Sequence, residues 1–271
     1  MPNDGGLREA YRTDGFLVLR DVLDHSFLDN LRAAILRPLT FLKHDRVGGG
    51  PLETDDEAAL QTSLLELKAT DEPAYLNALK LSQNDPSVLA AANNPAVIGA
   101  LKGAGVRHPV VSLKPFPILV AEELFIEGGY NLRPAHQEWP VMQGSHNGVV
   151  VWFPLHDLED GHSSLEVFPG SHLNGILEYE VSRCGSRITD KRLKEPLLLS
   201  VSKGDLVIFS AFTAHRSAEG ASKIRIAMSL RYNDMSEPSY IKRGFPDNTR
   251  TQITRDPIDD MVHYFEELPD S

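Results

Sequence analysis

The sequence predicts a mainly β protein, an antiparallel sandwich or barrel with helices packed on one side. From about residue 108 onward, short β-rich runs alternate with turns: 110–116, 118–126, 148–156, 164–170, 197–201, 205–210 and 224–232. Strands this short and frequent, without helices between them, are typical of antiparallel sandwiches and barrels. The preceding residues, 1–105, instead carry helical patterns. We expect a single domain, 1–271, with a helical part at about 1–105, a β core at about 106–235 and a C-terminal extension at about 236–271.

Four segments of the first part carry helix-start signals. Segment 24–39 begins with an N-cap candidate, Asp24 or Ser26, and its apolar residues recur at helical spacing. Segments 71–82, 85–94 and 94–105 each open with a polar cap and a proline in the first turn, and the last one ends at Gly103 or Gly105.

Three further segments, outside the predicted β core, have weaker secondary-structure signals. Residues 15–23 are a predicted strand, and 257–268 is a predicted short helix. The glycine-rich stretch 47–57 is expected to be a loop, and it could equally cover a site as a lid.

Composition excludes several classes of partner and compartment. With 27 Lys and Arg against 38 Asp and Glu, the net charge is −11, which argues against a nucleic-acid or anionic-membrane partner. Cys184 is the single cysteine, so no internal disulfide is expected. The N-terminus lacks the pattern of a signal peptide, and no apolar run approaches the roughly 18 residues that span a bilayer. We expect a cytoplasmic protein, monomeric or homodimeric, that acts on a small molecule.

The predicted strand 224–232 has two different faces. Ile224, Ile226, Met228 and Leu230 alternate with Arg225, Ala227, Ser229 and Arg231. The first face belongs to the core, and the second either lines a cavity or meets solvent.

The segment "PAHQEWPV", 134–141, places His136 and Glu138 two residues apart. In an extended strand they point to the same face, and Gln137 points to the other. The pair alone is consistent with metal ligation, with acid–base chemistry or with two polar residues at a solvent-exposed sheet edge. A third ligand candidate, His215, follows a Gly-Asp turn and a predicted strand, and Arg225 comes ten residues later. Two histidines and one carboxylate form the facial triad of non-haem Fe(II) sites, and arginine suits a two-pronged grip on the carboxylate of a keto acid.

Four segments resemble the phytanoyl-CoA dioxygenase family of Fe(II)- and 2-oxoglutarate-dependent oxygenases, nearly end to end. They are "DGFLVLRDVLDHSFLDNLRAAI", "HQEWPVMQGSHNGVVVWFPLHD", "SSLEVFPGSHLNG" and "GDLVIFSAFTAHRS". The resemblance implies a double-stranded β-helix, a cupin-like jelly roll, with the N-terminal helices packed on its major sheet. It also implies His136, Glu138 and His215 as iron ligands, with Arg225 and Ser217 at the distal carboxylate of 2-oxoglutarate and Trp152 beside it.

Three positions depart from the family pattern. Glu138 stands where relatives usually have aspartate, and we expect iron to be retained with a shifted geometry. The common Pro-Asn after the distal His-x-Ser is replaced by "AEGAS", and Glu127 stands near the place of a frequent lysine. The last change affects the details of cosubstrate binding rather than the reaction class.

Several other polar residues have a structural interpretation. His172, in a Pro-Gly-Ser-His turn, is expected to stabilise that turn, and His146, His156 and His162 are expected on the surface or in turns. Arg231 is a rival to Arg225 for the anion, but six strand residues, roughly 20 Å at ~3.3 Å each, separate them. We therefore expect only one of the two to serve a metal-bound ligand.

The resemblance implies oxidation of a C–H bond, coupled to release of succinate and CO2 from 2-oxoglutarate and consumption of O2. Hydroxylation is the expected outcome, and Glu138 argues against halogenation because family halogenases lack the carboxylate ligand. The expected substrate is a small polar metabolite or a natural-product intermediate. Two alternatives remain: a metal-binding cupin that does not use 2-oxoglutarate, and a non-catalytic protein of the same fold. Ser210 and Phe212 depart from the cupin pattern, and the intact triad argues against a non-catalytic protein.

Overall fold

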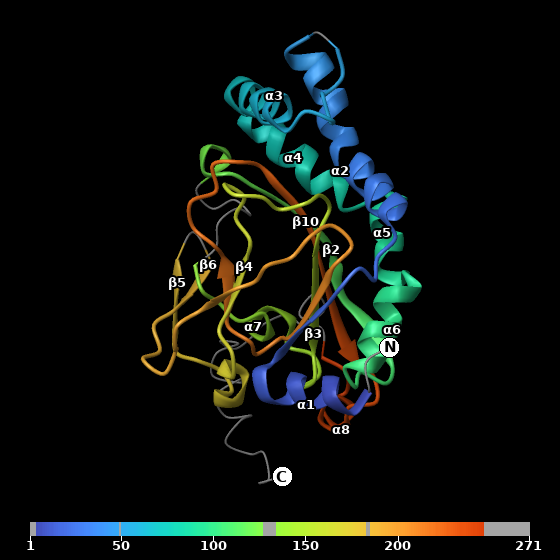
Figure 1. Cartoon of the computed structure of the whole chain (residues 1–271), viewed down its shortest axis with the longest axis vertical. Coiled ribbons are helices and arrows are strands. Elements are labelled where there is room, and N and C mark those ends of the chain that lie inside the picture. Colours follow the sequence, from blue (N-terminus) through green and yellow to red (C-terminus); the bar gives the residue numbers. More distant parts are fainter. Residues whose placement is uncertain (1–3, 49, 127–133, 183–184, 247–271) are drawn as a thin grey trace.

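A computed structural model describes residues 4–48, 50–126, 134–182 and 185–246. Helices pack along one face of the larger of its β-sheets, and the smaller sheets lie across from the other face (Figure 1). None of the helices in this described part is long and apolar enough to cross a membrane. The predicted helix at 257–268 and Cys184 lie outside the described residues.

The helices that cover the sheet begin where the polar caps stand. Asp24, Asp71, Asp85 and Asn94 each accept a hydrogen bond from a backbone N–H of the first turn that follows. Such caps satisfy amide groups that have no partner within the helix. The bounds are α1 Asp4–Asp14, α2 His25–Arg46, α3 Glu57–Thr70, α4 Glu72–Ser82, α5 Pro86–Ala90 and α6 Pro95–Gly103.

Two helices, α1 and α3, are not among the predicted ones. Helix α3 is capped by Asp56, which accepts from two backbone amides, and it buries Leu60, Leu64 and Leu67 at helical spacing. The acidic, glycine-rich stretch before it obscures this start. Helix α2 runs through Pro38 and ends seven residues later than predicted, at Arg46 rather than residue 39.

The larger sheet is antiparallel and has the strand order β1-β8-β3-β10-β2. Its strands are β1 Phe16–Leu19, β2 Pro109–Val120, β3 Val149–Pro154, β8 Leu206–Ser210 and β10 Arg225–Asp234. The predicted strands 110–116 and 118–126 are in fact one strand, β2, followed by a short 3-10 turn, η2 Glu122–Leu124. This strand pairs along the edge of the sheet with β10, and edge strands tolerate its prolines.

Two smaller sheets complete the β part. One has the order β7-β4-β9, with β4 Leu165–Val167, β7 Leu197–Leu198 and β9 His215–Ser217. The other pairs β5 Tyr179–Ser182 with β6 Gly185–Ile188. The predicted antiparallel, mainly β architecture with helices on one side is confirmed.

Strand β10 separates the core from the interior of the β part. Ile226, Met228 and Leu230 pack with the helices in one apolar cluster, and Arg225, Ser229 and Arg231 on the opposite face line a pocket. Each large apolar side chain buried in such a cluster stabilises the fold by ~1.5–3 kcal/mol. The alternation therefore belongs to a strand that lines a cavity rather than one that meets solvent.

The loop 47–56 connects α2 to α3. Its Leu52 is buried in the cluster between the helices and the sheet. None of its described residues lines the pocket on the inner face of β10, so the structure gives no support to a lid at this position.

Candidate metal centre and cosubstrate pocket

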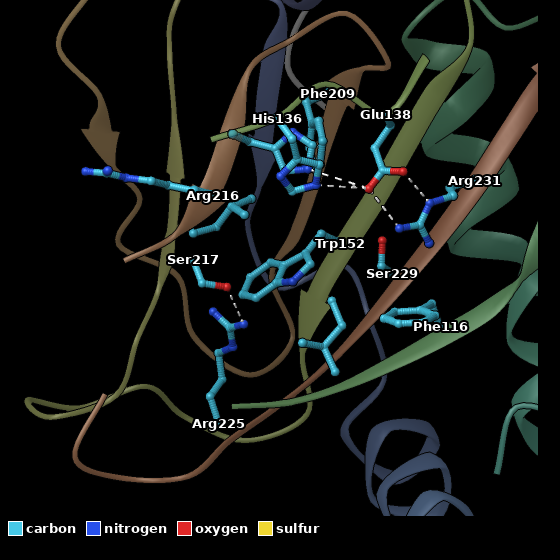
Figure 2. A pocket seen from close by; sticks show the side chains of 13 residues that line it. Phe116, His136, Glu138, Trp152, Phe209, Arg216, Ser217, Arg225, Ser229 and Arg231 are labelled. Atoms are coloured by element: carbon cyan, nitrogen blue, oxygen red, sulfur yellow. Dashed lines mark hydrogen bonds and ion pairs between the residues drawn. The ribbon is translucent and has the colours of Figure 1, made fainter. Parts of the chain in front are cut away.

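The segment that carries His136 and Glu138 is not a continuous strand, contrary to the prediction. The backbone of His136 forms an isolated antiparallel bridge with His215, through N–H to carbonyl contacts of 3.1 and 3.0 Å. Glu138 has helical dihedral angles, φ −85° and ψ −25°, and it precedes the short helix α7, Trp139–Met142. The two side chains nevertheless point to the same place (Figure 2).

Gln137 points away from the pocket, as predicted, and it anchors the segment. Its amide nitrogen donates to the carbonyls of Gly175 and Phe212 at 2.8 and 2.6 Å. Its amide oxygen accepts from the backbone N–H of Leu177 at 2.9 Å. The residue between the two ligand candidates is therefore bonded to two other segments, which restrains the backbone of both.

Three donor atoms converge inside the β part. The Nε2 atoms of His136 and His215 lie 3.5 and 3.8 Å from Oε1 of Glu138. One ligand atom from each side chain lies within 4.8 Å of the others, and all three residues are buried. Two imidazoles and one carboxylate are a donor set suited to non-haem Fe(II).

Main-chain carbonyls fix the tautomers of the two histidines. Nδ1 of His136 lies 2.8 Å from the carbonyl oxygen of Pro134, and Nδ1 of His215 lies 3.0 Å from that of Thr213. A carbonyl only accepts, so both Nδ1 atoms carry the proton. The lone pairs therefore sit on the Nε2 atoms, which face Glu138, and this is the arrangement of metal-bound histidines.

The charge of Glu138 is balanced by Arg231. The guanidinium donates from Nε to Oε2 at 2.9 Å and from Nη2 to Oε1 at 2.8 Å. Burial would by itself raise the pKa of this carboxyl, but the charge of Arg231 and the contacts with His136 and His215 hold the pKa well below its usual range. Burial, together with the neighbouring His136, lowers the pKa of His215. A carboxylate and two neutral imidazoles are the protonation states that a metal ion needs.

The position of Arg231 agrees with the expectation that only one of the two arginines serves a metal-bound ligand. It lines the same pocket as Arg225, but it bonds the carboxylate of Glu138. The alternation of β10 places both arginines on one face, but it does not indicate the contact of Arg231 with Glu138. Figure 2 shows Arg231 beside Glu138 and Arg225 at the other end of the pocket.

Arg225 is buried and has an incomplete set of partners. Its Nη1 donates to the carbonyl of Ser163 at 2.8 Å, and its Nη2 donates to Oγ of Ser217 at 2.9 Å. Its guanidinium carbon lies 5.5 Å from the centre of a Trp152 ring. Among the described residues, neither Nε of Arg225 nor Nε1 of Trp152 has a hydrogen-bond partner, and none of them forms an ion pair with Arg225. Burial lowers the pKa of Arg225 to about 10.

Unsatisfied buried donors next to a cation call for an anionic ligand, because an unpaired buried donor costs ~1–3 kcal/mol. The pocket that joins this cation to the metal centre also has apolar walls. Its lining comprises Phe116, Ile118, His136, Glu138, Trp152, Leu165, Phe209, His215, Arg216, Ser217, Arg225, Ser229 and Arg231. Every predicted site residue is among them, so the fold brings the complete predicted set together.

Comparison with known proteins agrees with this geometry. Residues 11–227 match the family model described as "Phytanoyl-CoA dioxygenase (PhyH)".

The chain belongs to the phytanoyl-CoA dioxygenase family.

A curated relative of this family member is the 1-deoxypentalenic acid 11-beta-hydroxylase of Streptomyces exfoliatus. It is 26% identical over 258 residues, which cover 88% of this chain and 83% of the relative. Two solved structures share the fold, each with a TM-score of 0.56. The epimerase SnoN in complex with Fe3+, alpha ketoglutarate and nogalamycin RO is 15% identical, over 94% of this chain and 92% of SnoN. The non-heme monooxygenase ThoJ is 18% identical, over 84% and 77%.

As a member of the phytanoyl-CoA dioxygenase family, the protein is an oxidoreductase with a cupin-like jelly-roll fold, and it uses Fe(II), 2-oxoglutarate and O2. The donor set found here fits that iron, and the unsatisfied donors around Arg225 fit the carboxylate of 2-oxoglutarate. Membership of this family decides against a cupin that does not use 2-oxoglutarate and against a non-catalytic protein. Glu127 lies outside the described residues.

The remaining histidines divide into two groups. Nε2 of His172 contacts the carbonyl of Arg12 at 3.0 Å, and the residue lies in the 3-10 turn Ser171–Asn174, in agreement with a structural role. His146 contacts Oγ of Ser239. His156 and His162 lie in the segment of bends and turns between β3 and β4, and both contact Glu57 on helix α3, a partner that the sequence did not indicate. That helix was not predicted, so no signal pointed to this contact.

Proposed function

We propose that this enzyme hydroxylates a C–H bond of a small polar metabolite or natural-product intermediate. In this proposal His136, Glu138 and His215 hold Fe(II), and Arg225, Ser217 and Trp152 hold the distal end of 2-oxoglutarate. One observation carries the proposal: three buried donor side chains converge at one end of a pocket whose other end holds a buried, incompletely paired arginine. Iron and 2-oxoglutarate together supply the oxidising chemistry when bound, with consumption of O2 and release of succinate and CO2.

The chain's own residues would bind 2-oxoglutarate, orient it and shield the pocket from water. Arg225 offers a charged donor to a carboxylate, and charge-assisted bonds of this kind are shorter and stronger than neutral ones. Ser217 holds that guanidinium in place from β9. The apolar side chains of Ile118, Leu165 and Phe209 limit the access of water to the pocket. Such exclusion strengthens the electrostatic contacts within the site and limits side reactions.

Hydroxylation is preferred over other outcomes for two reasons. The curated relative is named a hydroxylase, and Glu138 supplies the carboxylate that the facial triad requires. A natural-product intermediate is preferred as the substrate because the relative's name refers to 1-deoxypentalenic acid, and SnoN was solved with nogalamycin RO. Ser229 adds a polar group to the pocket wall and is the residue that we expect to contact such a substrate.

A titration under anaerobic conditions tests the assigned residues. Fe(II) is added to the protein with 2-oxoglutarate, and the weak visible metal-to-ligand charge-transfer band is recorded. We expect a band with the wild-type protein, none with His215→Ala, and a band that needs more 2-oxoglutarate with Arg225→Ala. No band with the wild type, or an unchanged band with His215→Ala, would refute the proposal.

A second assay addresses the substrate class. Candidate natural products are incubated with the iron-loaded enzyme, 2-oxoglutarate and labelled O2, and succinate formation is measured. A true substrate increases succinate release and gains one labelled oxygen atom, which mass spectrometry detects. A product that lacks the label would point to epimerisation or desaturation instead of hydroxylation.

We propose further that the enzyme acts in the cytoplasm, as a monomer or homodimer, on a small molecule rather than on nucleic acid or membrane. The net charge of −11 supports the choice of a small-molecule substrate, because polyanionic partners require a positive surface. Light scattering during size-exclusion chromatography measures the oligomeric state.

A further inference from the structure

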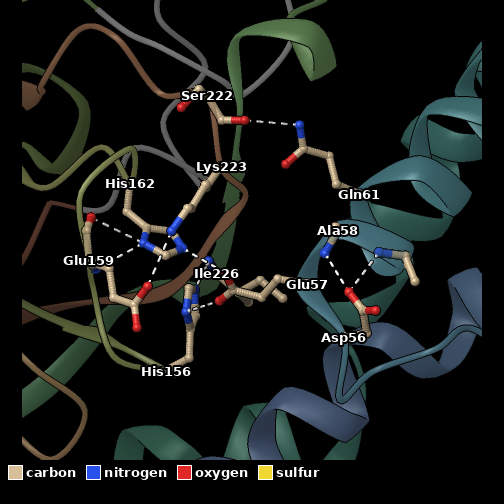
Figure 3. Close-up of polar contacts among 11 residues, drawn as sticks. Asp56, Glu57, Ala58, Gln61, His156, Glu159, His162, Ser222, Lys223 and Ile226 are labelled. Atoms are coloured by element: carbon tan, nitrogen blue, oxygen red, sulfur yellow. Dashed lines mark hydrogen bonds and ion pairs between the residues drawn. The ribbon is translucent and has the colours of Figure 1, made fainter.

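A second group of titratable side chains lies outside the metal centre, where helix α3 meets the β part (Figure 3). Glu57 is the first residue of α3, and His156 and His162 belong to the segment between β3 and β4. Oε1 of Glu57 lies 2.8 Å from Nδ1 of His156, and Oε2 lies 3.0 Å from Nε2 of His162. The side chain of His162 is only 1% exposed and that of His156 only 14%.

Two histidines and a glutamate could hold a metal ion, but the hydrogen bonds on their outer sides argue otherwise. The backbone N–H of Ile226 donates to Nε2 of His156 at 3.0 Å. The backbone N–H of Glu159 donates to Nδ1 of His162 at 2.9 Å, closer than the 3.2 Å from that nitrogen to the Glu159 carbonyl. A ring nitrogen that accepts carries no proton, so in the neutral ring the proton sits on the nitrogen that faces Glu57.

The metal centre shows the opposite arrangement. There the outer nitrogens of both histidines contact carbonyls, which leaves the inner lone pairs for a metal ion. The nitrogen–oxygen distances agree with this difference: they are 3.5 and 3.8 Å in the metal centre but 2.8 and 3.0 Å around Glu57. Nδ1 of His156 lies at ion-pair distance from Glu57 but has no hydrogen-bond partner among the described residues. Glu57 is therefore a carboxylate that faces two N–H donors.

These contacts involve residues close to Arg225, both along β10 and across from it. Ile226, whose amide bonds His156, is the next residue along β10. The neighbour of His162 is Ser163, whose carbonyl accepts from Nη1 of Arg225 at 2.8 Å. One turn further along α3, Gln61 donates to the carbonyl of Ser222 at 3.1 Å. Helix α3 thus fixes the backbone before and after Arg225 and one of the carbonyls that orient its guanidinium.

We propose that Glu57, His156 and His162 are positioning residues that orient Arg225 toward the distal carboxylate of 2-oxoglutarate. This inference rests on the proposed role of Arg225. The bond between a guanidinium and a carboxylate depends on distance and angle, and a displacement of ~1 Å at a positioned group is enough to lower its contribution strongly. Glu57 on helix α3 contacts both imidazoles. His156 in turn bonds the amide of Ile226, and His162 precedes Ser163, whose carbonyl bonds Arg225.

Other charged groups close to Glu57, His156 and His162 affect the pKa values in this cluster. Burial lowers the pKa of His156 to about 4, with Glu57 opposing and both His162 and Arg32 adding to the decrease. The pKa of Arg32 is also lowered by burial, and Glu57, Asp55 and Asp29 oppose that decrease. Lys223 pairs with Glu159 at 3.2 Å beside His162. A neutral His156 agrees with the hydrogen bond that its Nε2 accepts from the amide of Ile226, because a ring nitrogen that accepts carries no proton.

The affinity for 2-oxoglutarate tests the proposal, measured from the charge-transfer band with Fe(II) in the absence of oxygen. Glu57→Gln replaces one accepting oxygen by an NH2 group that opposes an imidazole N–H. We expect it, and His162→Ala, to raise the dissociation constant of 2-oxoglutarate roughly tenfold, the effect of one lost charged hydrogen bond, with iron affinity unchanged. His162→Gln keeps a donor near the place of Nε2, so we expect it to restore most of the affinity.

Lys68→Ala is the matched control, because Lys68 also joins α3 to the β part but bonds the segment that follows β2 rather than β10 or the segment that carries His156 and His162. Its ammonium donates to the carbonyls of Glu123 and Phe125, so we expect lower thermal stability with unchanged 2-oxoglutarate affinity.

Hydrogen exchange gives a readout that needs no cosubstrate: the amide of Ile226 should exchange faster in Glu57→Gln than in Lys68→Ala. In uncoupled turnover, the KM for 2-oxoglutarate should rise in Glu57→Gln while kcat stays within about twofold.

Arg225→Ala separates the two levels of the proposal. If it weakens 2-oxoglutarate binding but Glu57→Gln and His162→Ala do not, the positioning role is wrong and the proposed function stands. If Arg225→Ala itself leaves the affinity unchanged, the assigned arginine is wrong, and the inference fails with it.

Zinc titration of a His136→Ala/His215→Ala variant tests whether Glu57, His156 and His162 instead bind a metal ion. One bound ion that is lost on adding His162→Ala would make the cluster a metal site and overturn the inference.

Discussion

Arg231 grips Glu138 through two parallel hydrogen bonds, of 2.9 and 2.8 Å, with both side chains buried. The carboxylate that we assign to iron is therefore already ionised and oriented by a neighbour on β10. A buried carboxylate without such a partner would take up a proton, and a protonated carboxyl is a poor ligand. Arg225 and Arg231, six positions apart on β10, thus have different partners at opposite ends of one pocket.

Arg231→Met should weaken iron binding by roughly 10–100-fold, the usual effect of removing a group that orients a metal ligand. The dissociation constant for Fe(II), measured anaerobically by competition with a chelator, checks this. Arg216→Met is the matched control, because Arg216 lines the same pocket but pairs with Glu166 and Glu219. Equal iron affinities for Arg231→Met and the wild type would remove Arg231 from the metal centre.

Glu138→Asp should also lower iron affinity, although the family resemblance led us to expect aspartate at this position. Glu138 has a helical backbone at the start of α7, and the shorter side chain would retract the carboxylate by ~1.5 Å, one C–C bond. Hydrogen bonds of 2.8–2.9 Å to Arg231 do not survive such a shift. We expect a loss of about tenfold or more in Fe(II) affinity; unchanged affinity would show that the segment adapts to either residue.

Gly15→Ala should destabilise the fold near the distal histidine. Gly15 has φ +81°, and an added Cβ would lie 2.4 Å from Nδ1 of His172 and 2.6 Å from Oγ1 of Thr213. We expect a cost of ~2 kcal/mol or more from the left-handed backbone and the clash, seen as a decrease in Tm of several °C. Gly99→Ala is the control, because Gly99 lies within α6 with open space around it; alanine there should be neutral or stabilising.

The neutral state of His156 should make stability depend on pH. Its pKa in the folded protein is about 4 against 6.5 for an ordinary histidine, so the unfolded chain binds more protons between these values. The contribution is present above pH 6.5 and is lost as the pH falls toward 4, amounting to about 3 kcal/mol at most. Urea unfolding at a series of pH values measures it. His156→Asn should flatten the pH dependence in this window, and an equal slope in both proteins would contradict the assignment.

The helical part was predictable where local chemistry decides the structure. The polar caps at Asp24, Asp71, Asp85 and Asn94 act on amides two or three residues away, so their effect can be read without knowledge of the rest of the fold. Helix α3 carries the same signals, but an acidic, glycine-rich stretch precedes it. The alternation along β10 likewise predicted two faces, because side chains of a strand alternate whatever lies on either side.

The site was predictable in its members but less so in its geometry. His136, Glu138, His215 and Arg225 were identified by residue type, order and resemblance, and the fold brings them into one pocket. The helical backbone of Glu138 was not predicted, because a two-residue spacing is compatible with several conformations. The roles of Arg231, Glu57, His156 and His162 depend on contacts between residues 93 to 105 positions apart, and such contacts leave no local pattern.

Main-chain carbonyls, those of Pro134 and Thr213, set the proton positions of His136 and His215. A point substitution changes a side chain but leaves the carbonyl of that residue in place. The walls of the pocket can therefore diverge between relatives to accept different molecules, while the imidazole lone pairs stay directed at the same point. In this architecture the backbone sets the orientation of the two imidazoles, and the choice of substrate is left to the side chains of the pocket walls.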